Sequence, residues 1–170
     1  IASLNNGFAT WIWTDVLPAS GLVPAGSQRA FRKTFIPTPG ETPASTNILI
    51  AADDEYTLYV NGVLIGSASG YSVARQYIVN LEPAAELMFA VLATNGGTVA
   101  NHAGLLVSIE ISMAPAGRTN CTAGATLVSD ATWKSTKGAI PSGFQLPGFD
   151  DSTWPMAVSE AAYGAAPWGH

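Results

Sequence analysis

The dipeptide Asn61-Gly62 constrains the fold of this chain most, because it lies between two short runs of alternating apolar residues. The apolar residues that flank it are Leu58, Val60, Val63 and Ile65. A type I′ turn needs positive φ at both central residues, and Asn-Gly is the pair that adopts it most readily. The stretch 51–69 is therefore predicted to contain a β-hairpin that turns at Asn61-Gly62.

Similar strand patterns recur along the chain, separated by segments rich in Gly and Pro. They lie at 8–14, 29–36, 46–51, 76–81, 86–94, 104–113, 125–129, 132–135 and 156–162. Pro37–Ser45, with three prolines and a glycine, is predicted to be a loop. The strand 104–113 alternates most clearly and is predicted to be half-buried, with Leu106 and Ser108 on the face opposite Leu105 and Val107.

No segment shows a sustained helical period, and many short strands separated by turns are typical of a sandwich or barrel. With 170 residues, the chain fits a single domain spanning 1–170. The sequence thus predicts an all-β protein, an antiparallel β-sandwich with jelly-roll topology.

Charge and hydropathy exclude several partners. The net charge is −5, and the seven Lys and Arg residues are scattered. Nucleic acid needs a clustered basic stripe, and an anionic membrane surface needs a basic patch. The sequence contains no apolar run long enough to span a bilayer. We therefore expect neither nucleic acid nor a membrane as partner; the oligomeric state is left open.

The composition predicts a secreted protein. Lys is scarce, Ser, Thr, Gly and Ala are abundant, and a start at Ile1 suits a processed mature chain. The single cysteine, Cys121, cannot form an internal disulfide; a free thiol is expected, and a disulfide between two chains is the alternative. It lies within Asn120-Cys121-Thr122, a formal N-glycosylation sequon whose use the sequence leaves open.

Oxygen-bearing side chains follow two predicted strands. Asp53 and Asp54 precede the hairpin, whereas Asn95 and Asn101 lie in the loop after the strand 86–94. Carboxylate and amide oxygens are the ligands that Ca²⁺ prefers, and neighbouring carboxylates repel unless a cation or solvent offsets their charge. If these loops lie at one end of the sandwich, they would supply a calcium site, with Asp53, Asp54 and Asn95 as its ligands.

Sugar binding uses aromatic faces and polar contacts to hydroxyls. Tyr71 lies in a Gly-rich connection where a core role is unexpected, and Arg75 and His102 can contact a ligand or the acidic residues. The five tryptophans are instead predicted to pack in the core or between strands. They are Trp11, Trp13, Trp133, Trp154 and Trp168.

Catalytic patterns are weak. His102 is the one internal histidine, and no G-x-S-x-G motif accompanies it. The adjacent carboxylates Asp53-Asp54 and Asp150-Asp151 would point to opposite faces of a strand, so neither dipeptide is a ready acid–nucleophile pair. A small glycoside hydrolase or lyase that combines Asp53, Asp54 or Asp150 with His102 remains an alternative.

Several motifs, in order, resemble the N-terminal jelly-roll domains of α-L-rhamnosidases and related carbohydrate-binding modules of the galactose-binding-like fold. They are Trp11-Ile12-Trp13, FRKTF at 31–35, LYVNG at 58–62, Gly104-Leu105-Leu106, Ser129-Asp130, Trp133-Lys134 and FDDSTWP at 149–155. The resemblance covers nearly the whole chain. The resemblance indicates the fold more directly than the ligand, because these motifs are mainly signatures of the fold.

The resemblance implies sugar binding by loops at one end of the sandwich, with calcium in the rhamnose-binding members. It places the acidic position at Asp53-Asp54, the amide after the central strand at Asn95, and the aromatic of the crossover loop at Tyr71. The rhamnosidases carry a catalytic barrel after this domain, which is not part of this sequence, so the chain is expected to be either a free-standing lectin-like protein or a module of a larger enzyme. We therefore expect a secreted, non-catalytic, lectin-like domain for a neutral or deoxy sugar such as L-rhamnose. A sandwich that serves structure or protein interaction is the remaining alternative.

Overall fold

The computed structural model describes residues 9–14, 20–115 and 122–169, and within them the secondary structure is built from strands. The strands are β1 (Thr10–Trp13), β2 (Gln28–Phe35), β3 (Glu41–Asp53), β4 (Glu55–Val60), β5 (Val63–Ser69), β6 (Arg75–Asn80), β7 (Leu87–Thr94), β8 (Gly104–Pro115), β9 (Thr122–Val128), β10 (Lys134–Ser135) and β11 (Val158–Ala162). The sequon residue Asn120 and Cys121 lie outside the described residues.

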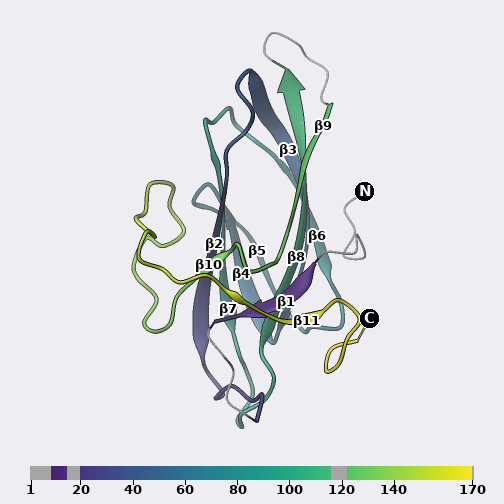
Figure 1. Cartoon of the computed structure of the whole chain (residues 1–170), viewed down its shortest axis with the longest axis vertical. Coiled ribbons are helices and arrows are strands. Elements are labelled where there is room, and N and C mark those ends of the chain that lie inside the picture. The colour runs from purple at the N-terminus through teal and green to yellow at the C-terminus, as the bar shows by residue number, and fades with distance from the viewer. Residues whose placement is uncertain (1–8, 15–19, 116–121, 170) are drawn as a thin grey trace.

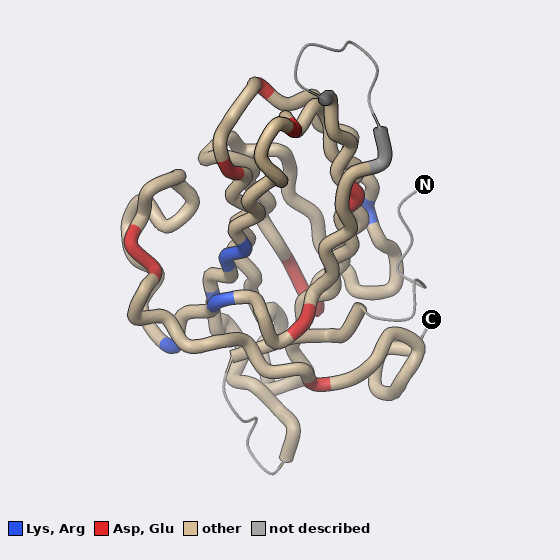
Figure 2. Tube along the Cα trace, turned by 45° about the horizontal axis from the view of Figure 1, so that its top comes forward, with Lys and Arg blue, Asp and Glu red and all other residues tan. Residues whose placement is uncertain are grey.

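Two antiparallel sheets face each other (Figure 1). One has the order β11-β1-β8-β3-β6, with β9 paired to β8 beside β1, and the other has the order β10-β2-β7-β4-β5. This confirms the predicted all-β sandwich. None of the described residues forms a helix long and apolar enough to cross a membrane. In Figure 2, acidic residues are spread over several strands and loops of the trace.

The predicted hairpin is present as β4 and β5. Asn61 and Gly62 form its turn, with φ of 48° and 82°. A register shift between Leu58 and Tyr59 adds a residue to the pairing. Leu58 is buried in the core, whereas Val63 is 62% exposed at the tip of the hairpin. The turn prediction was therefore correct, but only part of the apolar set faces the core.

The core fills the space between the two sheets, and smaller clusters cover the outer faces. Between the sheets lie side chains such as Trp13, Phe31, Ile50, Leu58, Phe89 and Ile109. Trp11 and Trp168 pack with Ala51 and Leu106 on the outer face of the β8-containing sheet. This second layer explains why Leu106 is buried, although the alternation predicted a half-buried strand; Ser108 is buried too.

The predicted loop Pro37–Ser45 was wrong in its second half, because β3 already begins at Glu41. The register between β3 and β8 shifts between Pro43 and Ser45. A proline cannot donate to a β-ladder and is tolerated at an edge or a bulge. The shift at Pro43 lets a proline-containing segment continue the strand, and β3 therefore spans 13 residues.

The segment 136–155 covers part of the outer face of the five-stranded sheet, on the left in Figure 1. Arg32, buried at 2% exposure, connects this segment to β2. Its guanidinium donates to the Asp151 carboxylate at 2.8 Å and to the backbone oxygens of Phe144, Leu146 and Phe149. Asp151, one of the carboxylates considered for catalysis, thus holds the segment against the sheet.

Candidate functional site

The chain crosses from one sheet to the other at Asp53-Asp54, a peptide bond in the cis form. Asp53 is the last residue of β3 and pairs with Gly104, the first residue of β8. The Asp54 N–H donates to the carbonyl oxygen of Thr94, the last residue of β7, at 3.1 Å. The strand ends therefore bring Asp53, Asp54 and the loop that starts at Asn95 to one end of the sandwich.

The side chain of Asp53 is buried and accepts a hydrogen bond from an indole ring. Asp53 is 7% exposed, and its Oδ2 accepts a 2.7 Å hydrogen bond from Nε1 of Trp168. Burial raises the pKa of Asp53 to about 6; the bond from Trp168 opposes this rise, and the neighbouring Asp54 adds to it. The ring of His102 packs edge-on against Trp168, with the ring centroids 6.2 Å apart.

Asp54 connects three loops. Its Oδ2 accepts a 2.7 Å hydrogen bond from the N–H of Gly96, and its carbonyl oxygen accepts one from the N–H of Gly70 at 2.7 Å. The loop β7–β8 and the end of β5 are thereby fixed on the same residue. The glycine at 96 matters for this contact, because a Cβ there would lie 3.2 Å from Asp54 Oδ2.

Two amide oxygens in this region lack partners. Asn95 is fully buried, and its Nδ2 donates to the carbonyl oxygens of Val23 and Pro24 at 2.8 and 3.2 Å. Its Oδ1 is buried and accepts no hydrogen bond, and the same holds for Oδ1 of Asn101. A buried acceptor without a partner costs free energy, so such atoms call for an explanation such as a bound ion or water.

We call Asp53, Asp54, Asn95, Asn101 and His102 the amide–carboxylate cluster. Asn101 is included because its backbone pairs with that of Val23, whose carbonyl oxygen also binds the Asn95 amide. His102 is included because its ring contacts Trp168, which binds Asp53. The loops that carry them lie at the bottom of Figure 1. The structure thus brings together five of the seven residues that the sequence singled out.

Tyr71 and Arg75 lie near this end but outside the cluster. Tyr71 is 43% exposed and lines a small cavity of about 70 Å³ beside Trp11, Tyr163 and Trp168. Trp11 and Trp168 stack there, with ring centroids 4.6 Å apart. Arg75 is the first residue of β6 and pairs with Ile50 of β3; it is exposed.

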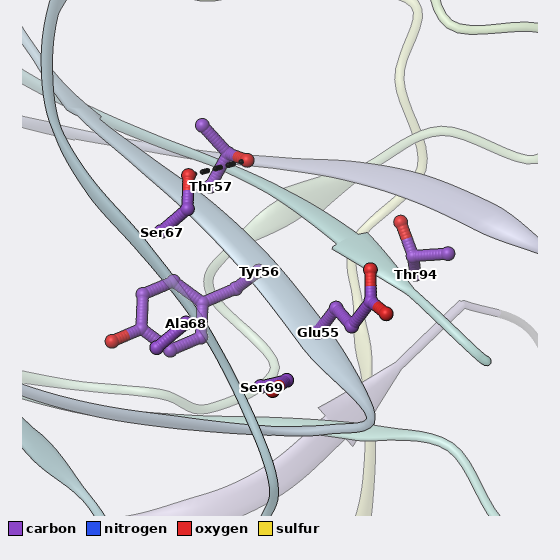
Figure 3. Close-up of a pocket in the computed structure, with 7 residues that line it drawn as sticks. All are labelled: Glu55, Tyr56, Thr57, Ser67, Ala68, Ser69 and Thr94. Atoms are coloured by element: carbon purple, nitrogen blue, oxygen red, sulfur yellow. Dashed lines mark hydrogen bonds between the residues drawn. The ribbon is translucent and has the colours of Figure 1, made fainter.

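A shallow groove of about 290 Å³ lies on β4 and β5, next to the cluster (Figure 3). We call it the polar groove. Its lining residues are Glu55, Tyr56, Thr57, Ser67, Ala68, Ser69 and Thr94. In Figure 3 the side chains of Glu55 and Thr94 lie beside each other, and a hydrogen bond of 3.0 Å joins the hydroxyls of Ser67 and Thr57.

Sequence reasoning missed the role of Trp168 and of the backbone groups. Trp168 was predicted to be a packing residue; it is buried as predicted, and it also binds Asp53. Its position outside any strand pattern, in the Gly-containing C-terminal stretch, was the available signal. The carbonyls of Val23 and Pro24 and the N–H of Gly96 carry no signal in the sequence, because every residue type offers them.

Comparison with known proteins finds relatives that bind or act on sugars. No protein-family model matches the sequence. An alpha-L-rhamnosidase of Streptomyces avermitilis is 30% identical over 168 residues, which cover 95% of this chain and 15% of that protein. The crystal structure of that enzyme complexed with L-rhamnose matches with a TM-score of 0.73 at 26% identity, over 95% of this chain and 15% of the other.

A lectin from Pleurotus ostreatus is also similar. Its apo form matches with a TM-score of 0.81 at 41% identity, over 95% of this chain and 44% of the lectin chain. Its complex with GalNAc matches with a TM-score of 0.85 at 35% identity, over 99% and 47%. The chain therefore spans less than half of the lectin and a small part of the rhamnosidase. The predicted resemblance to the rhamnosidase sandwich domain is confirmed, and the lectin shares the same fold.

Proposed function

We propose that this domain is a non-catalytic carbohydrate-binding module that holds a neutral sugar at the amide–carboxylate cluster. The observation that carries the proposal is the pair of buried, unpartnered amide oxygens of Asn95 and Asn101, in the loop whose Gly96 N–H binds the carboxylate of Asp54. The similarity to a lectin solved with GalNAc and to a rhamnosidase solved with L-rhamnose supports a sugar as the ligand.

The cluster has the donor set of a calcium site. Within the described residues, no three His, Cys, Asp or Glu side chains gather as a metal site, so a cation here would need amide or carbonyl oxygens as well. Ca²⁺ takes six to eight oxygen ligands of this mixed kind. The unpartnered Oδ1 of Asn95 fits such a role, because a bound cation would remove the cost of its burial.

In this proposal Asp53, Asp54 and Asn95 hold the ion. A bound Ca²⁺ would supply a Lewis-acidic centre that accepts sugar hydroxyls as further oxygen ligands. The protein's own groups keep the ligands in place: Trp168 orients Asp53, the Gly96 N–H orients Asp54, and Val23 fixes the amide of Asn95. Asn101 and His102 lie in the same β7–β8 loop as Asn95.

Tyr71 and Arg75 extend the proposed site on the side of β6. An exposed ring can pack against the C–H face of a pyranose, and a guanidinium can donate to hydroxyls. L-rhamnose, galactose and GalNAc are the first sugars to test. We also propose that the protein binds glycans outside the cell, in line with its low Lys content and its sequon at Asn120.

Calorimetric titration tests the proposal. The domain is titrated with L-rhamnose, galactose, GalNAc and glucuronic acid, each in calcium and then with chelator. We expect saturable heat with one neutral sugar that disappears with chelator. Heat that persists with chelator would overturn the calcium role, and no heat with any sugar would overturn the proposal. A reducing-sugar assay on plant and fungal polysaccharides should stay at background if the module is non-catalytic.

A further inference from the structure

The polar groove is the outer face of the five-stranded sheet at the end nearest the amide–carboxylate cluster. Strand register places four polar residues in one row across four adjacent strands, because Ser69 pairs with Glu55, Glu55 with Thr94, and Thr94 with Gln28. Paired residues share a face of a sheet. The second row on the same face begins with Ser67 and Thr57, which pair with each other.

The middle of this outer face is covered by the segment 136–155. Tyr59, Leu92 and Ala30 pack there with Phe144 of the segment 136–155, and the ring of Tyr59 meets that of Phe144 at 5.8 Å. Apolar side chains are thus buried where the segment lies on the sheet. Where the segment ends, the side chains become polar, and the sheet carries an open groove instead of a second apolar layer.

The groove is continuous with the cluster through the backbone. Asp54 donates its N–H to Thr94 and accepts the N–H of Gly70, which follows Ser69. Thr94 and Ser69 therefore belong to both regions, because they line the groove and lie next to the backbone contacts of Asp54. The groove therefore begins at the strand ends that flank Asp54.

The chemistry of the groove selects the kind of group that enters it. Thr57, Ser67, Ser69 and Thr94 offer hydroxyls that donate and accept, and the exposed Glu55 carboxylate only accepts. Tyr56, whose ring is drawn in Figure 3, is the one aromatic residue among the lining residues, and at 3% exposure its ring offers no open face to a ligand. Such a surface matches a ring rich in hydroxyl groups, and Glu55 disfavours a ligand carboxylate.

We propose that the polar groove is a second sugar subsite, which binds the next residue of a neutral glycan whose terminal residue lies at the amide–carboxylate cluster. The inference rests on the proposed function, because it takes the cluster as the primary sugar site. The groove's volume of about 290 Å³ lies just below the range of roughly 300–1,000 Å³ that ligand pockets occupy, which suits a single pyranose ring.

The test compares three ligands by calorimetric titration in calcium. All three carry the same terminal sugar, the one that binds best as a monosaccharide. The first is its methyl glycoside, the second its disaccharide with glucose, and the third its disaccharide with glucuronic acid. We expect the glucose disaccharide to bind about tenfold more tightly than the methyl glycoside, the gain that one or two net hydrogen bonds provide. The glucuronic acid disaccharide should show little of this gain.

A double variant and its control locate the effect. Thr57→Val with Ser67→Ala removes the exposed hydroxyl pair of the groove. Asn47→Ala with Gln76→Ala removes a comparable exposed pair, bonded at 2.8 Å, on the other sheet. The groove variant should bind the methyl glycoside as wild type does and lose the disaccharide gain to within about twofold, whereas the control variant should retain it.

The outcomes separate the two proposals. If the wild-type domain binds the methyl glycoside but gains nothing from the glucose residue, the subsite is overturned and the primary site stands. The same follows if the groove variant keeps the full gain. If the wild-type domain binds neither the methyl glycoside nor the disaccharide, the proposed function falls and the subsite with it.

Discussion

Nε1 of Trp168 donates a 2.7 Å hydrogen bond to Oδ2 of Asp53, which lies 115 residues earlier in the chain. The bond connects the C-terminal segment to the point where the chain passes from one sheet to the other. The same indole ring meets the ring of His102 edge-on. The C-terminal segment therefore belongs to the candidate site, in addition to packing on the outer face of β8.

Replacing Trp168 by Phe should keep a stacked ring against Trp11 but remove the only indole donor that reaches Asp53 among the described residues. We expect the free energy of unfolding to fall by about 1–3 kcal/mol, because a buried carboxylate loses a hydrogen bond. Urea denaturation measures it. Trp154→Phe, at a half-buried ring on the other sheet, is the control. Equal losses in the two variants would contradict the role given to Trp168.

Calcium should stabilise the folded domain if the cluster binds it. At a calcium concentration one hundred times its dissociation constant, the gain is about 2.7 kcal/mol, or roughly 5–10 °C in Tm for a chain of this size. Differential scanning fluorimetry with calcium and with chelator measures the shift. Asp54→Asn should abolish most of it, and Asp150→Asn, which alters an exposed carboxylate elsewhere, should leave it intact. A shift that survives Asp54→Asn would place the cation elsewhere.

The ion pairs of Asp151 should make stability depend on acid pH. Burial raises the pKa of Asp151, but the hydrogen bonds from Lys134 and Arg32, both at 2.8 Å, outweigh burial and hold the pKa below its usual value. A lowered pKa contributes stability that is present above the unfolded value of about 3.9 and is lost as pH falls through the folded value. The wild-type domain should therefore lose stability below about pH 4.

Asp151→Asn should remove this part of the acid dependence. At pH 7 it should cost roughly 3 kcal/mol, because the buried Arg32 guanidinium loses its charged partner. Urea titrations at pH 7 and at acid pH give both quantities. Asp150→Asn, at the adjacent exposed residue, is the matched control. If Asp151→Asn unfolds with the wild-type pH profile, the ion pairs do not hold the segment 136–155 in place.

Gly104 should tolerate no side chain. A Cβ there would lie 2.9 Å from atoms of both Trp11 and Trp168. Gly104→Ala should cost about 1–3 kcal/mol through overpacking, and it should weaken sugar and calcium binding by displacing Trp168 from Asp53. Gly138→Ala, where a Cβ would meet nothing within 4 Å, is the control and should change stability little. Unchanged ligand affinity in a folded Gly104→Ala variant would show that the indole position does not matter for binding.

Local patterns predicted the fold well where one physical requirement dominates. Asn61-Gly62 defined the hairpin, because few residue pairs accept positive φ at two successive positions. The run 86–94 was recognised as a central strand and is β7, with β2 and β4 on its two sides. The alternation of 104–113 failed to predict burial, because whether the second face of β8 meets water depends on Trp11 and Trp168, which are distant in sequence.

The candidate site was predictable in its residue types but not in its geometry. Asp53, Asp54 and Asn95 could be singled out because carboxylates and amides at strand ends suit an oxygen-binding cation. Nothing in the sequence indicates that the Asn95 amide donates to the carbonyl oxygens of Val23 and Pro24, or that the Gly96 N–H donates to the Asp54 carboxylate. Those contacts join loops that lie 42 to 72 residues apart.

The sequence alone determined the class of the fold, the turn at Asn61-Gly62, and the presence of oxygen-bearing side chains at strand ends. These follow from local backbone preferences and from side-chain chemistry, both of which act over a few residues. Only the tertiary structure decided that Trp168 lies on Asp53, that Oδ1 of Asn95 is buried without a partner, and that a polar row crosses four strands from Ser69 to Gln28. The physical reason is that burial and strand register are set by packing between segments distant in the chain.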